Sequence, residues 1–241
     1  MSPNYKIVLE YDGTHFYGWE LQHNKRTVRG ELEKALQKIF GERPKIYVAS
    51  RTDSGVHALN QLANFKVGKS MDVNELRNAL NGNLPHDIYI KSVEQVDADF
   101  NARYAPKRKI YLYRLLPGRS PLRRLYVWEY YKKGFDFYKV RDVATVFVGR
   151  YNFRNFAYKD EGICEVYRVE VTQVGDEIHF EIEGNRFLYK MVRMMVGSLV
   201  WVNEGKLTVD DIKNMLANKI DRKGFTAPPQ GLYLKEVIFS L

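Results

Sequence analysis

Residues 45–67 read KIYVASRTDSGVHALNQLANFKV. Two apolar runs, residues 45–50 and 60–67, have the composition of β-strands, and a polar turn that contains Asp53 and Gly55 separates them. An Asp in such a turn is usually local, because its carboxylate accepts hydrogen bonds from nearby backbone amides. Alternatively, Asp53 is the carboxylate around which an active site is built. The stretch by itself leaves both interpretations open.

The stretch lies in the middle of a regular alternation over the first hundred residues. Apolar residues recur at period two in the strand-like segments and on one face of the helix-like segments. Thr27 and Asp72 are expected to cap the two helices, and Gly82 is expected to end the second. The order βαββαβ is that of a ferredoxin-like or RRM-like unit, an antiparallel sheet with helices on one face. The expected strands are residues 5–11, 45–50, 60–67 and 87–96, and the expected helices are 27–40 and 72–82.

The second half repeats this α+β logic with longer helices. Pro106 excludes a helix where the two halves join. We therefore expect two halves of similar architecture, residues 1–104 and 105–241, with antiparallel or mixed sheets and a basic cleft along the join. A hairpin turn is expected at Gly175-Asp176. The expected strands are 108–116, 165–174, 177–184 and 231–239, and the expected helices are 135–148, 187–202 and 208–217.

The charge of the chain is concentrated in one segment. The net charge is +9, and residues 103–133 hold ten Lys or Arg and a single acid, Glu129, so this segment alone carries +9. Tyrosines are interleaved with these cations. A solubilising charge excess would not need aromatic residues, whereas a surface that holds phosphates and stacks bases would. The pattern favours a nucleic-acid partner over a plain solvated face.

Several classes of function lack their sequence signatures. There is no P-loop, dinucleotide-binding glycine motif or H-E-x-x-H, and the five His residues have no metal-ligand spacing. We therefore expect no metal and no nucleotide cofactor. Cys164 is the single cysteine, more consistent with a buried small hydrophobe than with a nucleophile. No apolar run reaches the length of about 20 residues that a membrane span needs, and the N-terminus shows no signal peptide. A cytoplasmic protein is expected.

One charge stands in an unusual place. Arg193 lies within GNRFLYKMVRMMVG, residues 184–197, among Met and Val side chains. A charge in such surroundings is costly unless it is paired. Either the side chain extends to the surface, or it is buried with a carboxylate partner from elsewhere in the chain. The pattern does not decide between these two.

Five motifs in order give the chain a family resemblance. SRTDSGVHAL resembles the R-T-D-[AS]-G-V-H-A motif of the TruA family of tRNA pseudouridine synthases. The other four are similar to the opening, the central strand, the arginine helix and the closing turn of that family. They read YDGTHFYGWELQ (11–22), FNARYAPKRKIYLY (100–113), GNRFLYKMVRMMVG (184–197) and TAPPQGLYL (226–234). The sequence departs from the family pattern at Glu20, where Gln is usual, and at 151–152, where an acid commonly precedes Phe153.

The resemblance implies a fold, a reaction and partners. The fold would be the α+β pseudouridine synthase fold, and the enzyme an isomerase, an intramolecular transferase that converts uridine to pseudouridine without a cofactor. The expected substrate is tRNA, at positions 38, 39 and 40 of the anticodon stem-loop. Because the target base is stacked, it must first be flipped out. Members of the family are homodimers, so a homodimer is expected.

The resemblance also assigns residues. Asp53 would be the essential carboxylate, acting at ribose C1′ as a nucleophile or as a stabiliser of positive charge. Tyr111 would stack on the flipped base, and a role in moving the C5 proton is left open. Arg193 would pair with Asp53 and keep it ionised. Further tRNA contacts are expected from Arg51, Arg103, Arg108, Lys109, Gln22 and His57.

Rival functions remain at this stage. One is a tRNA-binding or RNA-folding protein without catalysis on the same scaffold, which would not need the Asp53, Tyr111 and Arg193 constellation. Another is a pseudouridine synthase that acts on a different RNA or a different uridine. A third is a hydrolase that uses Asp53 on a nucleoside and releases free base.

Overall fold

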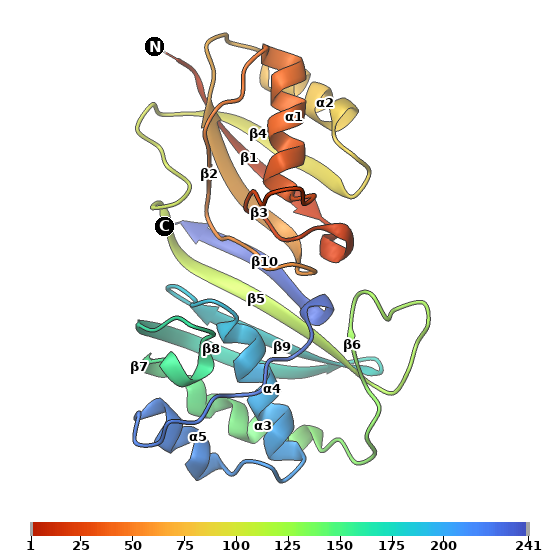
Figure 1. The fold of residues 1–241 in the computed structure, drawn as a ribbon, viewed down its shortest axis with the longest axis vertical. Helices are drawn as coiled ribbons and strands as arrows, with labels where there is room; N and C mark the ends of the chain where they lie inside the picture. The colour runs from red at the N-terminus through yellow and green to blue at the C-terminus, as the bar shows by residue number, and fades with distance from the viewer. Residues whose placement is uncertain (1, 240–241) are drawn as a thin grey trace. The chain divides into compact units, whose positions relative to one another are not determined.

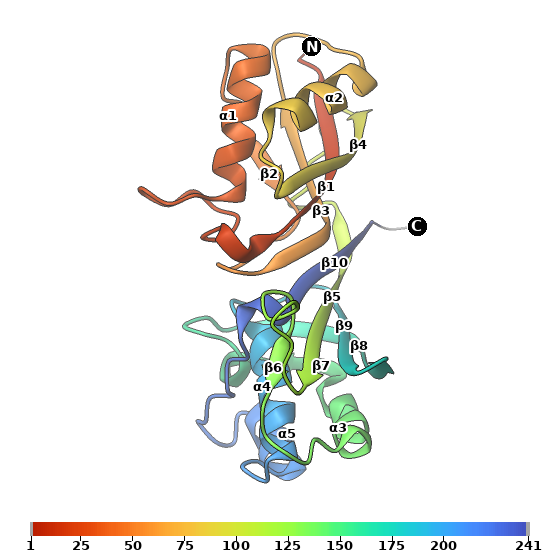
Figure 2. The same cartoon turned by 90° about the vertical axis from the view of Figure 1, so that its right-hand side faces the viewer.

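The structure is a computed structural model that describes residues 2–239. The chain forms two compact units, of which unit 1 runs up to Lys107 and resumes at Leu234, and unit 2 comprises Arg108–Tyr233. Strands and helices alternate in both (Figures 1 and 2), so the predicted α+β class is confirmed. The functional division at residues 104 and 105 stays a prediction. No helix of the described part is long and apolar enough to cross a membrane.

Unit 1 is built around strand β1. It pairs antiparallel with β3 on one side and with β4 on the other, while β2 pairs antiparallel with β3. Alternate β1 side chains (Tyr5, Ile7, Leu9 and Tyr11) are buried, as the period-two pattern predicts. The strands are β1 (Asn4–Tyr11), β2 (Ile46–Val48), β3 (His57–Lys66), β4 (Ile88–Val96) and β10 (Leu232–Phe239), which follows β3.

Helices α1 (Val28–Phe40) and α2 (Val73–Asn83) complete the predicted βαββαβ order. The Thr27 hydroxyl accepts a hydrogen bond from the Gly30 amide, and the Asp72 carboxylate accepts from the amides of Asn74 and Glu75, so both predicted caps are confirmed. The prediction that Gly82 ends α2 is wrong. The helix continues to Asn83 and stops because Leu84 precedes Pro85, and a residue before proline is driven to extended backbone.

The strands of unit 2 continue the order of the sheet as β5-β9-β8-β7. These strands pair antiparallel, whereas the short β6 pairs parallel with β5. The predicted hairpin turn is present, with Gly175 at φ +62°. Strands β6 and β7 were not predicted from the sequence. The strands are β5 (Pro106–Pro117), β6 (Trp128–Tyr130), β7 (Gly149–Asn152), β8 (Ile163–Val174) and β9 (Glu177–Gly184).

Helices α3 (Phe137–Ala144), α4 (Met191–Asn203) and α5 (Val209–Leu216) belong to the same unit. Helix α4 begins four residues later than the predicted start at Phe187, because Lys190 has φ +62° and a right-handed helix cannot pass through a left-handed residue. Helix α3 is shorter than predicted and continues as a 3₁₀ turn. The 3₁₀ turns are η1 (Gly13–His15), η2 (Thr145–Phe147), η3 (Arg154–Phe156) and η4 (Pro229–Gly231).

Candidate active site

Asp53 lies in the turn between β2 and β3 and is half-buried. Its carbonyl accepts a hydrogen bond from the Val56 amide at 3.2 Å, and Gly55 has φ +76°, so the local geometry is that of a tight turn. Thr52, the residue before it, is buried, and its hydroxyl lies 2.7 Å from the Tyr11 hydroxyl. The turn is therefore stabilised by a hydrogen bond between its own residues and by a contact with Tyr11 of β1.

Residues 11–19 of the opening motif contact the turn and hold it in place. The Trp19 amide donates to the Thr52 carbonyl at 3.1 Å, and the Gly55 amide donates to the Phe16 carbonyl at 3.2 Å. The opening motif can come this close to the turn only because two of its residues, Gly13 and Gly18, lack a Cβ atom. A Cβ on Gly18 would lie 2.7 Å from the Thr52 carbonyl oxygen, and a Cβ on Gly13 would lie 2.0 Å from that of Val56. Two motifs that are 30 residues apart in sequence thus form one support for Asp53.

His57 is part of this support. Its side chain is 2% exposed, and its Nδ1 accepts a hydrogen bond from the Gly13 amide at 3.0 Å. The Asp12 Oδ1 atom also lies 3.2 Å from Nδ1. His57 therefore braces the turn from inside unit 1. Its burial favours a positioning role, and the predicted contact with tRNA stays a prediction.

Tyr111 lies on β5 of unit 2, opposite Ile182 of β9, and its side chain is buried. Its ring meets the ring of Phe187 edge to face, with centroids 5.1 Å apart and an interplanar angle of 82°. Phe187 belongs to the loop that leads into α4. The orientation of Tyr111 is therefore fixed by a ring from the same motif that contains Arg193.

Arg193 is 9% exposed, so its side chain is buried and does not extend to the surface, and its predicted carboxylate partner stays a prediction. Its Nε donates to the carbonyl of Ala227 at 2.7 Å, and the Ala227 amide donates to the Arg193 carbonyl at 3.1 Å. Helix and closing segment approach closely because of Gly197, where a Cβ would lie 2.0 Å from the Phe225 carbonyl oxygen. The carbonyl of Ala227 thus accepts one of the hydrogen bonds that the Arg193 guanidinium can donate, and it fixes the orientation of this side chain.

Sequence reasoning missed Tyr113 and the role of the closing motif. The Tyr113 hydroxyl donates to the Pro228 carbonyl at 2.8 Å, and burial raises the pKa of this phenol well above its ordinary value, an effect that the charge of Arg193 opposes. A Cβ on Gly231 would lie 2.7 Å from the Tyr113 ring. The closing motif therefore holds both the arginine and this second tyrosine. The sequence feature that could have indicated Tyr113 is its position two residues after Tyr111, on the same face of the strand.

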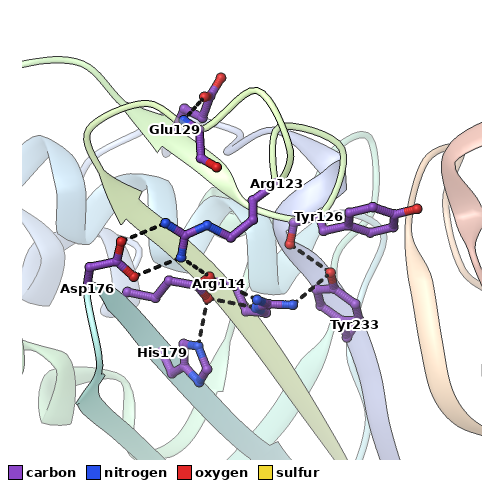
Figure 3. A network of polar contacts seen from close by, with 9 residues as sticks. Arg114, Arg123, Tyr126, Glu129, Asp176, His179 and Tyr233 are labelled. Carbon is purple, nitrogen blue, oxygen red and sulfur yellow. Dashed lines mark hydrogen bonds and ion pairs between the residues drawn. The ribbon is translucent and has the colours of Figure 1, made fainter.

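The basic segment is partly neutralised within unit 2 (Figure 3). The Glu177 carboxylate is buried and accepts from Arg114 at 2.8 and 2.9 Å and from Arg123 at 2.9 Å, and it lies 3.0 Å from Nε2 of His179. Burial raises the pKa of Glu177, but the hydrogen bonds from Arg114 and His179 lower it by more than burial raises it. The pKa of Glu177 therefore lies below its ordinary value. Arg123 also binds Asp176 at 2.6 Å.

These contacts anchor residues 118–127, which connect β5 to β6 and are called the arm below. At one end, the Tyr233 hydroxyl donates to the Tyr126 carbonyl at 2.7 Å (Figure 3). At the other, the Glu129 carboxylate accepts from the Ser120 amide at 2.6 Å. Four of the ten cations in residues 103–133 bridge to acids of unit 2, which lowers the charge that this segment presents. They are Arg108, Arg114, Arg123 and Lys132.

Arg51, Gln22 and Arg103 are exposed predicted contact residues. Arg51 is adjacent to the Asp53 turn. The Gln22 amide donates to the Tyr17 carbonyl at 2.6 Å, and the Arg103 guanidinium lies 5.5 Å from the centre of the Tyr104 ring. All three are accessible to a ligand, and their contact with tRNA stays a prediction.

Arg108 and Lys109 lie on β5, three and two residues before Tyr111. The Arg108 guanidinium binds Glu183 at 3.0 Å and stands 5.0 Å from the Tyr167 ring centre, whereas Lys109 is half-buried. Cys164 is completely buried, as predicted. In residues 2–239 no group of three His, Cys, Asp or Glu side chains could hold a metal ion.

The departure at Glu20 has a local explanation, because its carboxylate pairs with Arg29 of α1. Arg29 also binds Glu33 one turn further along that helix at 2.8 Å. The other departure, at Tyr151 and Asn152, lies on β7, where the Asn152 side chain accepts from the amides of Arg154 and Gly162. Neither departure reaches the support of the Asp53 turn.

Comparison with known proteins places these motifs in a family. A family model described as "tRNA pseudouridine synthase" matches residues 7–105 and 143–240. A protein named tRNA pseudouridine synthase A from Thermoanaerobacter sp. (strain X514) is 41% identical, over 98% of this chain and 99% of its own. One of the same name from Brachyspira hyodysenteriae is 40% identical, over 98% of each chain. The chain belongs to the tRNA pseudouridine synthase family.

Proposed function

We propose that this protein is an isomerase that converts uridine to pseudouridine at positions 38, 39 and 40 of the tRNA anticodon stem-loop. Asp53 acts at ribose C1′ of a flipped nucleotide. The observation that carries the proposal is the support of the Asp53 turn, in which two glycines and a buried histidine fix the backbone around one half-buried carboxylate. An ordinary surface turn does not need such a support, whereas a reacting group must be held in place.

The reaction is redox-neutral. The N1–C1′ glycosidic bond breaks, the base rotates, a C5–C1′ bond forms, and the proton lost from C5 is balanced by one gained at N1. Positive charge develops at C1′ when the glycosidic bond weakens. An ionised Asp53 stabilises this charge or adds to C1′ as a nucleophile, as a carboxylate does in retaining glycosidases.

Tyr111 and Arg193 have complementary roles in this proposal. Tyr111 stacks on the flipped base, a role that suits a ring whose orientation Phe187 fixes. Arg193 pairs with Asp53 and keeps it ionised, a role that suits a buried guanidinium whose Nε is already satisfied by Ala227.

The remaining proposals concern binding and setting. Arg51 engages the backbone of the flipped nucleotide or fills the space that it leaves. Arg103, Arg108, Lys109 and Gln22 contact tRNA, which fits the exposed positions of Arg51, Arg103 and Gln22. The protein works as a homodimer in the cytoplasm, with tRNA as its macromolecular substrate.

The decisive experiment replaces Asp53. Asp53→Asn should abolish pseudouridine formation in tRNA, by at least about 10³-fold, and leave tRNA affinity within about threefold. The matched control is Asp99→Asn, an exposed Asp of the same unit, which should keep wild-type activity. Activity retained in Asp53→Asn would refute the assignment. Inactive wild-type protein that still binds tRNA would favour the non-catalytic alternative.

Two further measurements separate the remaining rivals. Mapping of pseudouridines in tRNA from a strain that lacks this protein should show their loss at positions 38, 39 and 40, whereas loss at other sites would assign a different uridine. Assays for free uracil after incubation with RNA should find none. Release of uracil in proportion to enzyme would establish the hydrolase instead.

A further inference from the structure

Two tyrosines of unit 2 form an exposed pair beside the loop that carries Phe187. Tyr158 is 42% exposed and Tyr189 is 47% exposed, and their rings meet edge to face with centroids 5.7 Å apart. Single exposed aromatic residues are common on protein surfaces and need no explanation. Two in contact, contributed by segments 30 residues apart, form a continuous aromatic surface instead.

Lysines surround this pair. The Lys190 ammonium stands 3.9 Å from the centre of the Tyr158 ring and 5.0 Å from that of Tyr189, and Lys159 stands 5.5 Å from the Tyr158 ring. Asp160 and Glu161 follow Lys159 in the chain. The Asp160 carboxylate accepts from the amides of Glu161 and Tyr189. The Asp160 carboxylate is therefore bound by backbone amides. The lysines suit the phosphate of a nucleotide ligand, and the tyrosine rings suit its base.

The backbone holds the pair in a conformation that costs energy. Among the described residues four non-glycine residues have positive φ, and two are Asn, which adopts this region readily. The other two are Lys159 at φ +51° and Lys190 at φ +62°, and both flank the tyrosine pair. The Tyr158 amide donates to the Tyr189 carbonyl at 3.0 Å and joins the two loops. Strain of this kind persists where the surroundings impose it, and it is frequent at binding sites.

The pair is linked to Tyr111 through Phe187, which lies two residues before Tyr189. Phe187 packs against Tyr111, and Leu188 between Phe187 and Tyr189 is buried, so the loop is anchored. Residues 187 and 189 are at most about 7 Å apart in an extended chain. A nucleotide next to one that reaches Tyr111 would therefore meet Tyr189.

We propose that Tyr158 and Tyr189, with Lys159 and Lys190, form a stacking platform for a nucleotide that neighbours the target uridine in tRNA. This rests on the proposed function and adds a binding surface to it. The platform stacks an unpaired base and holds its phosphate, so it favours targets beside unpaired nucleotides. It does not take part in bond breaking.

The test compares aromatic with aliphatic side chains. Tyr158→Leu with Tyr189→Leu should raise the Kd and KM for tRNA at least about tenfold and change kcat by less than about threefold. Tyr158→Phe with Tyr189→Phe should remain close to wild type, because stacking needs the ring and not the hydroxyl. Tyr138→Leu on α3 is the matched control, since Tyr138 is 67% exposed and also has a cation over its ring. This variant should leave the Kd, KM and kcat for tRNA unchanged.

Three readouts keep the test decisive. Crosslinking to tRNA that contains 4-thiouridine should label Tyr158 or Tyr189 in wild-type protein, and Lys190→Asn, which tolerates positive φ, should lower the salt dependence of log Kd by about one. Unchanged Kd in the double Leu variant, or crosslinks confined to other segments, would overturn the platform. A change of sedimentation with unchanged Kd would assign the pair to a contact between subunits and also overturn it. Because Kd and crosslinks do not require turnover, an inactive wild-type protein would refute only the proposed function.

Discussion

Gly18 has φ +85°, and a Cβ there would lie 2.7 Å from the Thr52 carbonyl oxygen. The same residue therefore meets two requirements, a left-handed backbone and close contact with the Asp53 turn. Asp53 itself carries no such signal, because an Asp is equally common in turns without function. At the scale of the residue, the glycines around a carboxylate reveal more about its role than the carboxylate does.

Gly18→Ala should lower pseudouridine formation by at least about tenfold, because the Thr52 carbonyl must move and Asp53 moves with it. The matched control is Gly41→Ala in the same unit. Gly41 has φ +76°, and a Cβ there meets nothing within 4 Å. Both variants should lose about 1–2 kcal/mol of unfolding free energy from the left-handed backbone. Urea denaturation and tRNA turnover measure the two effects, and equal activity in both variants would contradict the proposed support.

At the scale of elements, α4 shows where propensity and packing disagree. Gly197 lies inside this helix, where alanine would ordinarily be favoured by about 0.5–1 kcal/mol. A Cβ there would lie 2.0 Å from the Phe225 carbonyl oxygen, so the closing segment would be displaced. The apolar periodicity of the sequence predicted the helix correctly, but it could not show that a backbone segment crosses it at this glycine.

Gly197→Ala should therefore destabilise the protein by at least about 2 kcal/mol, against its helix propensity, and lower turnover because Ala227 no longer holds Arg193. Gly82→Ala in α2 is the control, since nothing lies within 4 Å of a Cβ there. It should stabilise the protein by about 0.5–1 kcal/mol. Thermal denaturation of both variants is the measurement. Stabilisation by Gly197→Ala would show that the segment does not pack on the helix as described.

One buried acid, Glu177, is among the groups that anchor the arm, because it binds Arg123. Glu177→Gln should weaken the hydrogen bonds that Glu177 accepts from Arg114 and Arg123 and loosen the arm. Trypsin should then cut faster after Arg119 and Arg124, which lie on the arm. Glu170→Gln is the control, because the Glu170 side chain is 50% exposed and pairs only with Arg168 among the described residues. Equal cleavage rates in the two variants would show that Glu177 does not anchor the arm.

The same acid predicts a pH dependence. The pKa of Glu177 in the folded protein lies below its ordinary value of 4.5, so the unfolded chain takes up its proton at higher pH than the folded protein. The stabilisation is fully present above about pH 4.5 and is lost as the pH falls through the folded pKa. Unfolding free energies measured between pH 7 and pH 3 should decline less steeply in Glu177→Gln than in wild type. Parallel profiles would refute this.

At the scale of the whole molecule, the net charge of +9 predicts tRNA binding that weakens steeply with salt. Within the described part of the chain, some Lys and Arg side chains form ion pairs with acids and others do not. Arg119 on the arm is exposed and has no acid bridge among residues 2–239, whereas Arg141 on α3 pairs with Asp142 at 2.9 Å. Arg119→Gln should lower the slope of log Kd against log salt by about one, and Arg141→Gln should leave it unchanged. Equal slopes would place tRNA away from the arm.

The sequence alone determined the α+β class, most strands and helices, the helix caps, the position of Asp53 in a turn and the family. These depend on short-range periodicity and on motifs, which are visible within a few residues of the chain. The errors were equally local, since Pro85 rather than Gly82 ended a helix, and left-handed Lys190 delayed the start of another.

Only the tertiary structure decided what holds the functional residues. Gly13 and Gly18 meet the Asp53 turn, Ala227 binds Arg193, and Glu177 binds two arginines of the basic segment. Each contact joins segments about 30 to 60 residues apart, and no period or composition relates such segments. They meet because folding buries the strands and helices between them, so the partner of a buried polar group is set by the packing of the whole unit.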